Sequence, residues 1–155
     1  MLVGMLGRTY VDENCSVARA LEMVGERWSL LIIRDALLRG FCRFSEFQRS
    51  LAIAPNILAS RLEGFVEAGL MEVRTHPDRV GQHTYVLTEK GRQLAPVILA
   101  LTAWGDRWAA PDGPPVAYQH QRCSGAIDLQ VRCSICGDLS ATGDLTARPR
   151  RTEPA

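Results

Sequence analysis

Residues 44–70 read FSEFQRSLAIAPNILASRLEGFVEAGL and predict two short helices joined by a tight connection. In the first helix, Phe44, Phe47 and Leu51 recur at helical spacing, and Ser45 is a suitable N-cap residue. The second helix opens with Pro55, which a first turn tolerates because an N–H at that position has no partner within the helix.

The second helix is predicted to bury one face and to present the other. Its inward positions are Ile57, Leu58, Leu62 and Phe65, and Gly69 ends it. Its outward face carries small, polar and basic side chains, the kind of surface that a major groove accepts.

Two runs of alternating apolar and polar residues follow, at residues 70–74 and 84–88, with a turn-rich and partly basic tip at 76–83. Such a pattern predicts a β-hairpin. A helix-turn-helix followed directly by a hairpin is a winged helix. The predicted fold class is therefore α+β and mainly helical.

Further helices are predicted on both sides of the winged helix. Residues 15–24 and 26–39 precede it, and a helix from Thr88 to Trp108 follows it, with Pro96 marking either a kink or a new start. The last helix carries an apolar stripe: Leu94, Val97, Ile98, Leu101, Trp104 and Trp108. This stripe either closes the core of one chain or packs against a second subunit. We favour a homodimer formed by this helix together with the amino-terminal helix from Cys15, because two tryptophans near the end of a terminal helix exceed what a small core needs.

The chain divides into four predicted segments. Residues 1–14 form a flexible arm and residues 15–110 the winged-helix and dimerisation domain. Residues 111–140 are a small extension that contains Cys and His, and residues 141–155 are a disordered tail poor in apolar side chains.

Composition limits the classes of function. The 155 residues are 46% hydrophobic and 23% charged, with a formal net charge of +1, so any argument for nucleic-acid binding has to be local. No apolar run reaches the ~18–20 residues that a membrane span needs. The amino terminus has no signal-peptide layout, and we expect a cytoplasmic protein without membrane contact.

Residues 15–104 resemble the HxlR-type branch of the MarR-like winged-helix regulators. The resemblance is carried by Gly25-Glu-Arg-Trp28, Leu30-Leu-Ile-Ile-Arg-Asp-Ala-Leu, Arg43-Phe-Ser-Glu-Phe, Leu58-Ala-Ser-Arg-Leu62, Ala68-Gly-Leu and Tyr85-Val-Leu-Thr-Glu-Lys-Gly91. It implies a dimeric bacterial transcription regulator, here favoured as a repressor, that binds a palindromic double-stranded DNA operator. It also implies a response to a small electrophile, an oxidant or a metabolite.

The resemblance assigns a set of DNA-facing positions to the first helix, the recognition helix and the wing. They are Arg43, Ser45, Asn56, Ala59, Ser60, Arg61, Arg74, Arg79 and His83. Asparagine can pair with adenine, and arginine with guanine or phosphate. For Arg61 a second interpretation stays open, in which it pairs with Glu63 or Glu67 or anchors the helix internally. Ala54 and Asn56 differ from the residues usual in the family, so no operator sequence follows from the resemblance.

Cys15 lies at the start of a predicted helix, where the helix dipole favours a thiolate. In the resembling family a cysteine at this position serves some members as a redox switch. The alternative is a small residue packed at a subunit seam, since free cysteine is often buried.

Four residues near the carboxyl end have the spacing of a structural zinc site: His120, Cys123, Cys133 and Cys136. Two turns that each supply two ligands suit the tetrahedral preference of Zn²⁺. The alternatives are a vestigial site or a disulfide formed on oxidation.

Two other classes of function are weighed against a DNA-binding regulator. Winged helices also dock on proteins, and the nearly neutral net charge is compatible with that role. An enzyme is not expected, because no nucleophile stands in a recognisable motif with His76 or His83.

Overall fold

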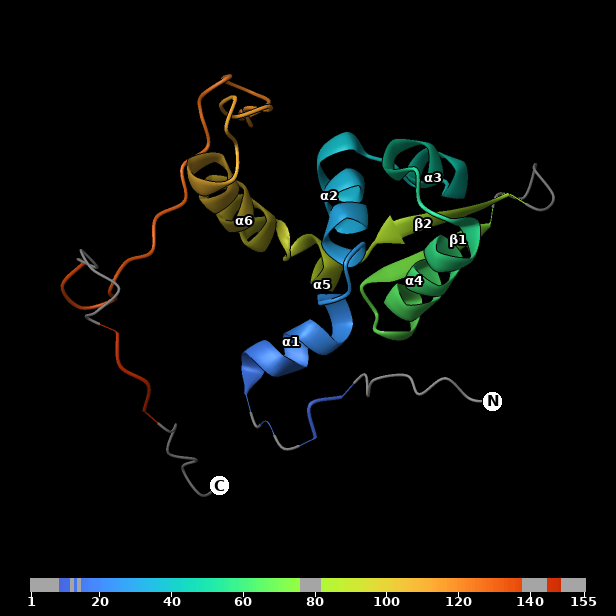
Figure 1. Ribbon diagram of the computed structural model, residues 1–155, viewed down its shortest axis with the longest axis horizontal. Helices are drawn as coiled ribbons and strands as arrows, with labels where there is room; N and C mark the ends of the chain where they lie inside the picture. The colour runs from blue at the N-terminus through green and yellow to red at the C-terminus, as the bar shows by residue number, and fades with distance from the viewer. Residues whose placement is uncertain (1–8, 12, 14, 76–81, 138–144, 149–155) are drawn as a thin grey trace. The chain divides into compact units, whose positions relative to one another are not determined.

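The computed structural model describes residues 9–11, 13, 15–75, 82–137 and 145–148. The chain separates into two compact units, Met1–Pro111 and Asp112–Ala155. The helices and strands all lie in the first unit (Figure 1). In order they are α1 (Ser16–Val24), α2 (Ser29–Arg39), α3 (Phe44–Leu51), α4 (Pro55–Glu67), β1 (Met71–Thr75), β2 (His83–Leu87), α5 (Glu89–Arg92) and α6 (Ala95–Trp108).

The core of this unit lies between α2, α3, α4 and the hairpin. Phe47 of α3, Leu58 and Leu62 of α4, and Ile32 and Ile33 of α2 are fully buried. Residues three and four positions apart share a helix face, which explains why these side chains converge. The structure confirms the predicted helix-turn-helix.

One predicted core position of α4 is wrong. Ile57 is 37% exposed, whereas Leu58, Leu62 and Phe65 are buried. A residue directly before Leu58 is rotated by about 100° around the helix axis, and this takes its side chain off the buried face.

β1 and β2 pair in antiparallel register, with Met71 opposite Leu87 and Thr75 opposite His83. The hairpin is the predicted wing, shifted by one residue toward its tip. The shift has a local cause. Leu70 N–H donates to Phe65 O at 2.8 Å to close the end of α4, and Thr88 begins the next helix as its N-cap.

The predicted helix from Thr88 to Trp108 is two helices. α5 ends at Arg92 and α6 begins at Ala95, with Pro96 in its first turn. The structure therefore confirms the new start at Pro96 rather than the kink. Figure 1 shows α6 on the side of α2 away from α3 and the wing.

Within the described residues, no helix is both long and apolar enough to cross a membrane.

Candidate nucleic-acid interface

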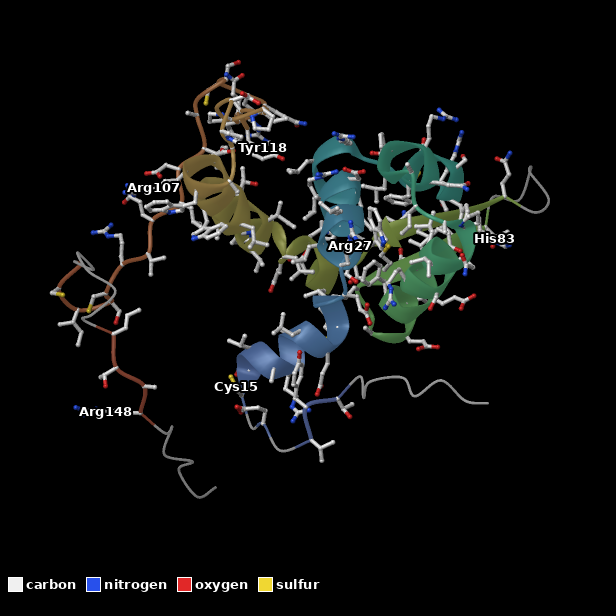
Figure 2. The ribbon with its side chains drawn as sticks, viewed as in Figure 1. Cys15, Arg27, His83, Arg107, Tyr118 and Arg148 are labelled. Atoms are coloured by element: carbon white, nitrogen blue, oxygen red, sulfur yellow. The ribbon has the colours of Figure 1, made fainter. Side chains whose placement is uncertain are left out.

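The segment just before α3 is joined to strand β2 of the wing through the backbone. Tyr85 N–H donates to Cys42 O at 2.7 Å, and Arg43 forms an isolated β-bridge with Thr84. As a result, three residues that were predicted to face DNA lie around one hollow of about 390 Å³: Arg43, Ser45 and His83. Figure 2 shows His83 near the tip of the wing, where β2 begins.

Glu46 holds the turn before α3 in place. Its Oε2 accepts hydrogen bonds from the N–H groups of Cys42 and Arg43, both at 2.9 Å. These two backbone donors, followed by the nearby Arg43 and Arg49 charges, lower the pKa of the Glu46 carboxyl, although partial burial opposes them.

The predicted N-cap at Ser45 is wrong, because the N-cap residue of α3 is Arg43. Ser45 lies inside the first turn, and its side chain is exposed. Glu46, three residues after the N-cap, supplies the reciprocal half of a capping box by accepting the N–H groups of Cys42 and Arg43. The Ser45 hydroxyl therefore remains on the surface beside Arg43.

α4 presents its amino-terminal half outward. Asn56 is exposed, and Ala59 and Ser60 are half-buried. Further along the helix, Glu63 and Glu67 are exposed and carry the charge that phosphate repels. Base contacts in helix-turn-helix proteins come mainly from the start of the recognition helix. The acidic residues in the second half of α4 likewise favour its amino-terminal half as the part that contacts DNA.

Arg61 turns toward the connection between α1 and α2. Its Nη2 lies 3.4 Å from Glu26 Oε2, and its side chain is only 19% exposed. The predicted alternative partners were Glu63 and Glu67, but the ion pair in the structure is with Glu26. Arg61 also lines a second hollow of about 500 Å³, which α1, this connection and α4 enclose together.

Of the two arginines predicted to contact DNA from the wing, Arg74 and Arg79, only Arg74 lies in the described residues. Arg74 forms a 2.6 Å ion pair with Glu72 on the same strand, and both side chains are exposed. Arg79 lies outside the described residues. His83 is exposed, and its Nδ1 lies 3.4 Å from Thr75 Oγ1 on the paired strand.

Sequence reasoning missed a buried carboxylate beneath the helix-turn-helix. Asp35 of α2 is fully buried and accepts hydrogen bonds from Ser50 Oγ at 2.6 Å and from Arg34 at 2.8 and 2.9 Å. Arg39 in turn donates to Ser50 Oγ at 2.9 Å. This network joins α2 to the end of α3. An acidic residue within an otherwise apolar helix was the available signal.

The HxlR-like helix-turn-helix family model matches residues 23–113, which span this whole arrangement. The chain belongs to this family of transcriptional regulators. The uncharacterized HTH-type transcriptional regulator Rv3095 of Mycobacterium tuberculosis H37Rv is 41% identical over 143 residues, or 92% of this chain and 87% of the relative.

Solved structures agree with this assignment. The crystal structure of PA1607 superposes with a TM-score of 0.78 at 39% identity and covers 88% of this chain and 96% of that one. The reduced form of YodB from Bacillus subtilis gives a TM-score of 0.54 at 32% identity, over 64% of this chain and 98% of that one. The quinone-bound form of YodB from Bacillus subtilis gives a TM-score of 0.51 at 31% identity and covers 61% of this chain and 99% of that one. The curated relatives are named as transcriptional regulators, a function that is not enzymatic.

In this HxlR-like chain, Cys15 is the N-cap residue of α1 and is exposed (Figure 2). Its carbonyl accepts the Arg19 N–H at 3.1 Å. The Arg19 guanidinium donates to Tyr10 O at 2.9 Å and to Glu13 O at 2.8 Å, so it fastens the described part of the amino-terminal arm to α1. Cys15 is therefore not packed within its own chain.

The residues of the predicted zinc site form two separate pairs. His120 Nδ1 lies 3.2 Å from Cys123 Sγ. Cys133 is hydrogen-bonded by the backbone N–H groups of Cys136 and Ile135 and by the Cys136 side chain, and these contacts lower the pKa of the Cys133 thiol to about 7. Within the described part of the chain, no three His, Cys, Asp or Glu side chains are grouped to hold a metal ion. None of the five cysteines, which all lie in the described residues, forms a disulfide.

Proposed function

We propose that this HxlR-like protein is a homodimeric repressor that binds an inverted-repeat operator and releases it in response to a thiol-reactive small molecule. The observation that carries this proposal is the hollow that joins the start of α3 to the first half of strand β2 in the wing. Arg43, Ser45 and His83 lie together there, although His83 is separated from the other two by the whole of α4 and β1.

Each part of this interface has a distinct role in the proposed complex. The start of α4 enters the major groove, where Asn56 reads base edges. Arg43 and Ser45 contact phosphates beside the groove, and the wing residues Arg74, Arg79 and His83 contact the neighbouring backbone or minor groove. With a net charge of only +1, the affinity for DNA depends on these local cations.

The proposed dimer interface is an exposed apolar face on α6. Val97, Leu101, Trp104 and Trp108 follow one another at helical spacing, and the two tryptophans are 63% and 66% exposed in the single chain. Val17 and Leu21 of α1 are exposed as well. A second copy of the chain would cover these side chains. It would also place two recognition helices ~34 Å apart, one helical turn of DNA.

The proposed sensor is Cys15. YodB, which shares the fold, has been solved with a bound quinone, so a relative of this chain binds an electrophile. Cys15 is exposed at the start of α1, and α1 belongs to the proposed dimer interface. Modification of this thiol would therefore change the interface and with it the spacing of the two recognition helices.

The test is fluorescence anisotropy of labelled DNA from upstream of the chain's own gene, at several salt concentrations. We expect tight binding that random DNA does not displace and that weakens as salt rises. Arg43→Ala should weaken binding, whereas Arg122→Ala, a matched exposed arginine in the second unit, should not. Equal and salt-insensitive binding to every duplex would contradict the proposal and favour a winged helix that docks on protein.

The sensor is tested with the same assay. Treatment with a quinone should release the operator from the wild-type protein and from Cys42→Ser, but not from Cys15→Ser. Release that persists in Cys15→Ser would assign the response to another thiol.

A further inference from the structure

The second unit has almost no apolar core of its own. In its described residues, 112–137 and 145–148, no side chain is buried. Ile135 is 94% exposed and Val131 is 70% exposed, and Ile127 and Leu129 are exposed as well. Segments of this size without a core commonly depend on a metal ion or on disulfides for a stable fold.

Two turns in this unit share one backbone geometry. In the first, Ser124 N–H donates to His120 O at 2.8 Å, and Ser124 has φ of 56°. In the second, Gly137 N–H donates to Cys133 O at 3.0 Å, and Gly137 has φ of 77°. Each turn therefore places a left-handed residue directly after a pair of potential ligands that are three residues apart.

The first turn is the tip of a small hairpin. Gln119 and Ala126 form a β-bridge, His120 N–H donates to Gly125 O at 2.8 Å, and Ile127 N–H donates to Tyr118 O at 3.2 Å. The turn is thus fixed by backbone pairing on both sides, independently of its side chains.

Each turn also brings its two ligand atoms together. His120 Nδ1 and Cys123 Sγ are 3.2 Å apart, and the Cys136 side chain is hydrogen-bonded to Cys133. Around Cys133, the backbone N–H groups of Ile135, Cys136 and Gly137 point at the sulfur. Each turn therefore presents two potential ligand atoms side by side.

We propose that His120, Cys123, Cys133 and Cys136 bind one Zn²⁺ per chain and that binding folds the second unit. One imidazole and three thiolates form a Cys₃His set, which suits tetrahedral zinc. The pairs are not grouped in the structure, so the chain between the hairpin and Cys133, residues 128–132, must bend back to bring them onto one ion. Leu129 and Val131 lie in this stretch and would gain a surface to pack against.

The proposal is tested on the full chain purified with a reductant and without a chelator. Elemental analysis should give one zinc per chain for the wild-type protein and for Cys42→Ser, a matched control with a thiol outside the unit. Cys123→Ser and Cys133→Ser should lose most of the metal. A protein that holds no zinc above the buffer blank and binds none when Zn²⁺ is added would overturn the proposal, as would equal losses in all three variants.

Cobalt substitution reports the ligands directly. The Co²⁺ protein should show the visible bands of a tetrahedral site together with thiolate charge-transfer absorption, which should weaken in Cys123→Ser and persist with altered bands in His120→Ala. Zn²⁺ should also slow proteolysis within residues 112–155 and leave the first unit unaffected. Octahedral Co²⁺ bands, or tetrahedral bands that are unchanged in Cys123→Ser and Cys133→Ser, would contradict the site.

Discussion

The guanidinium of Arg61, on the recognition helix, lies 3.4 Å from the carboxylate of Glu26, in the connection between α1 and α2. The arginine that the family resemblance places at DNA is thus paired with an acid of its own chain. A phosphate approaching α4 would compete with Glu26 for the same cation. The pair links the recognition helix to the region that precedes α2, and both partners line the 500 Å³ hollow.

Glu26→Gln should strengthen operator binding by about twofold to fivefold, because releasing a partly exposed ion pair recovers at most ~1 kcal/mol. Arg61→Ala should weaken binding and lower the salt slope by about one. Anisotropy titrations at several salt concentrations measure both effects. Glu22→Gln is the matched control, because Glu22 lines the same hollow but pairs with Arg19.

In the double variant, removal of Glu26 should have no further effect once Arg61 is absent. A Glu26→Gln protein that binds as weakly as Arg61→Ala would contradict competition. It would show instead that the pair holds the recognition helix in place.

Replacement of Asp35 should destabilise the helix-turn-helix. Asp35→Ala leaves the Ser50 hydroxyl and the Arg34 guanidinium without their buried acceptor and should lower the free energy of unfolding by about 2–3 kcal/mol. Urea denaturation followed by circular dichroism measures this loss. Glu89→Ala removes an exposed acid paired with Arg92 and should change stability by less than about 0.5 kcal/mol. Equal effects of the two substitutions would contradict the role given to the buried network.

The contrast between Asp35 and Phe47 shows what the sequence could predict. Helical spacing placed Phe47, Leu58 and Leu62 in the core, since periodicity reports which face is buried. The same rule failed for Ile57, because an apolar residue at the edge of a buried face need not turn inward. Asp35 and Glu26 were missed because their partners, Ser50 and Arg61, come from other helices, and such pairings depend on packing that no local pattern encodes.

The residues of the candidate interface could be predicted from the sequence one by one, but their arrangement in space could not. The resemblance named Arg43, Ser45 and His83 one by one, but only the pairing of Cys42 and Arg43 with β2 brings them around one hollow. The N-cap of α3 was misplaced because Arg43, which has no hydroxyl, occupies the cap position, while Glu46 three residues later accepts the N–H groups of Cys42 and Arg43.

Gly91→Ala should be strongly destabilising. Gly91 is buried in α5, and a Cβ there would collide with the backbone carbonyl of Leu70 and with the Leu87 side chain. A backbone atom cannot move aside as a flexible side chain can, so we expect a loss of about 1–3 kcal/mol. Thermal unfolding measures it. Gly64→Ala is the control, because nothing lies within 4 Å of the added carbon and the helix should gain up to about 1 kcal/mol. A Gly91→Ala protein as stable as Gly64→Ala would exclude this close contact.

Glu46 should make stability depend on pH in the acidic range. Its pKa is lowered in the folded chain, chiefly by the Cys42 and Arg43 N–H groups, so the unfolded state binds the proton more tightly. The stabilisation is then complete above the ordinary carboxyl pKa of about 4.3 and is lost as pH falls through the lower folded value. Glu46→Gln keeps an acceptor oxygen but removes this titration.

The measurement is urea unfolding of both proteins from neutral pH downward. Their difference in unfolding free energy should stay constant above about pH 5.5 and shrink below about pH 4.5. A difference that is constant across the whole range would show that the charge of Glu46 contributes nothing to folding.

The exposed face of α6 should control the oligomeric state. Trp104 is 63% exposed in the single chain and lies on one helix face with Leu101 and Trp108. Placing a charge there would force an unpaired ion into the proposed apolar interface, so Trp104→Glu should convert the proposed dimer to a monomer. Sedimentation velocity measures the mass, and circular dichroism checks that the monomer is folded. Val73→Glu puts the same charge on an exposed apolar residue of the wing and should remain dimeric. Leu101→Lys should repeat the effect of Trp104→Glu with the opposite charge, and a dimer that persists in both α6 variants would place the interface elsewhere.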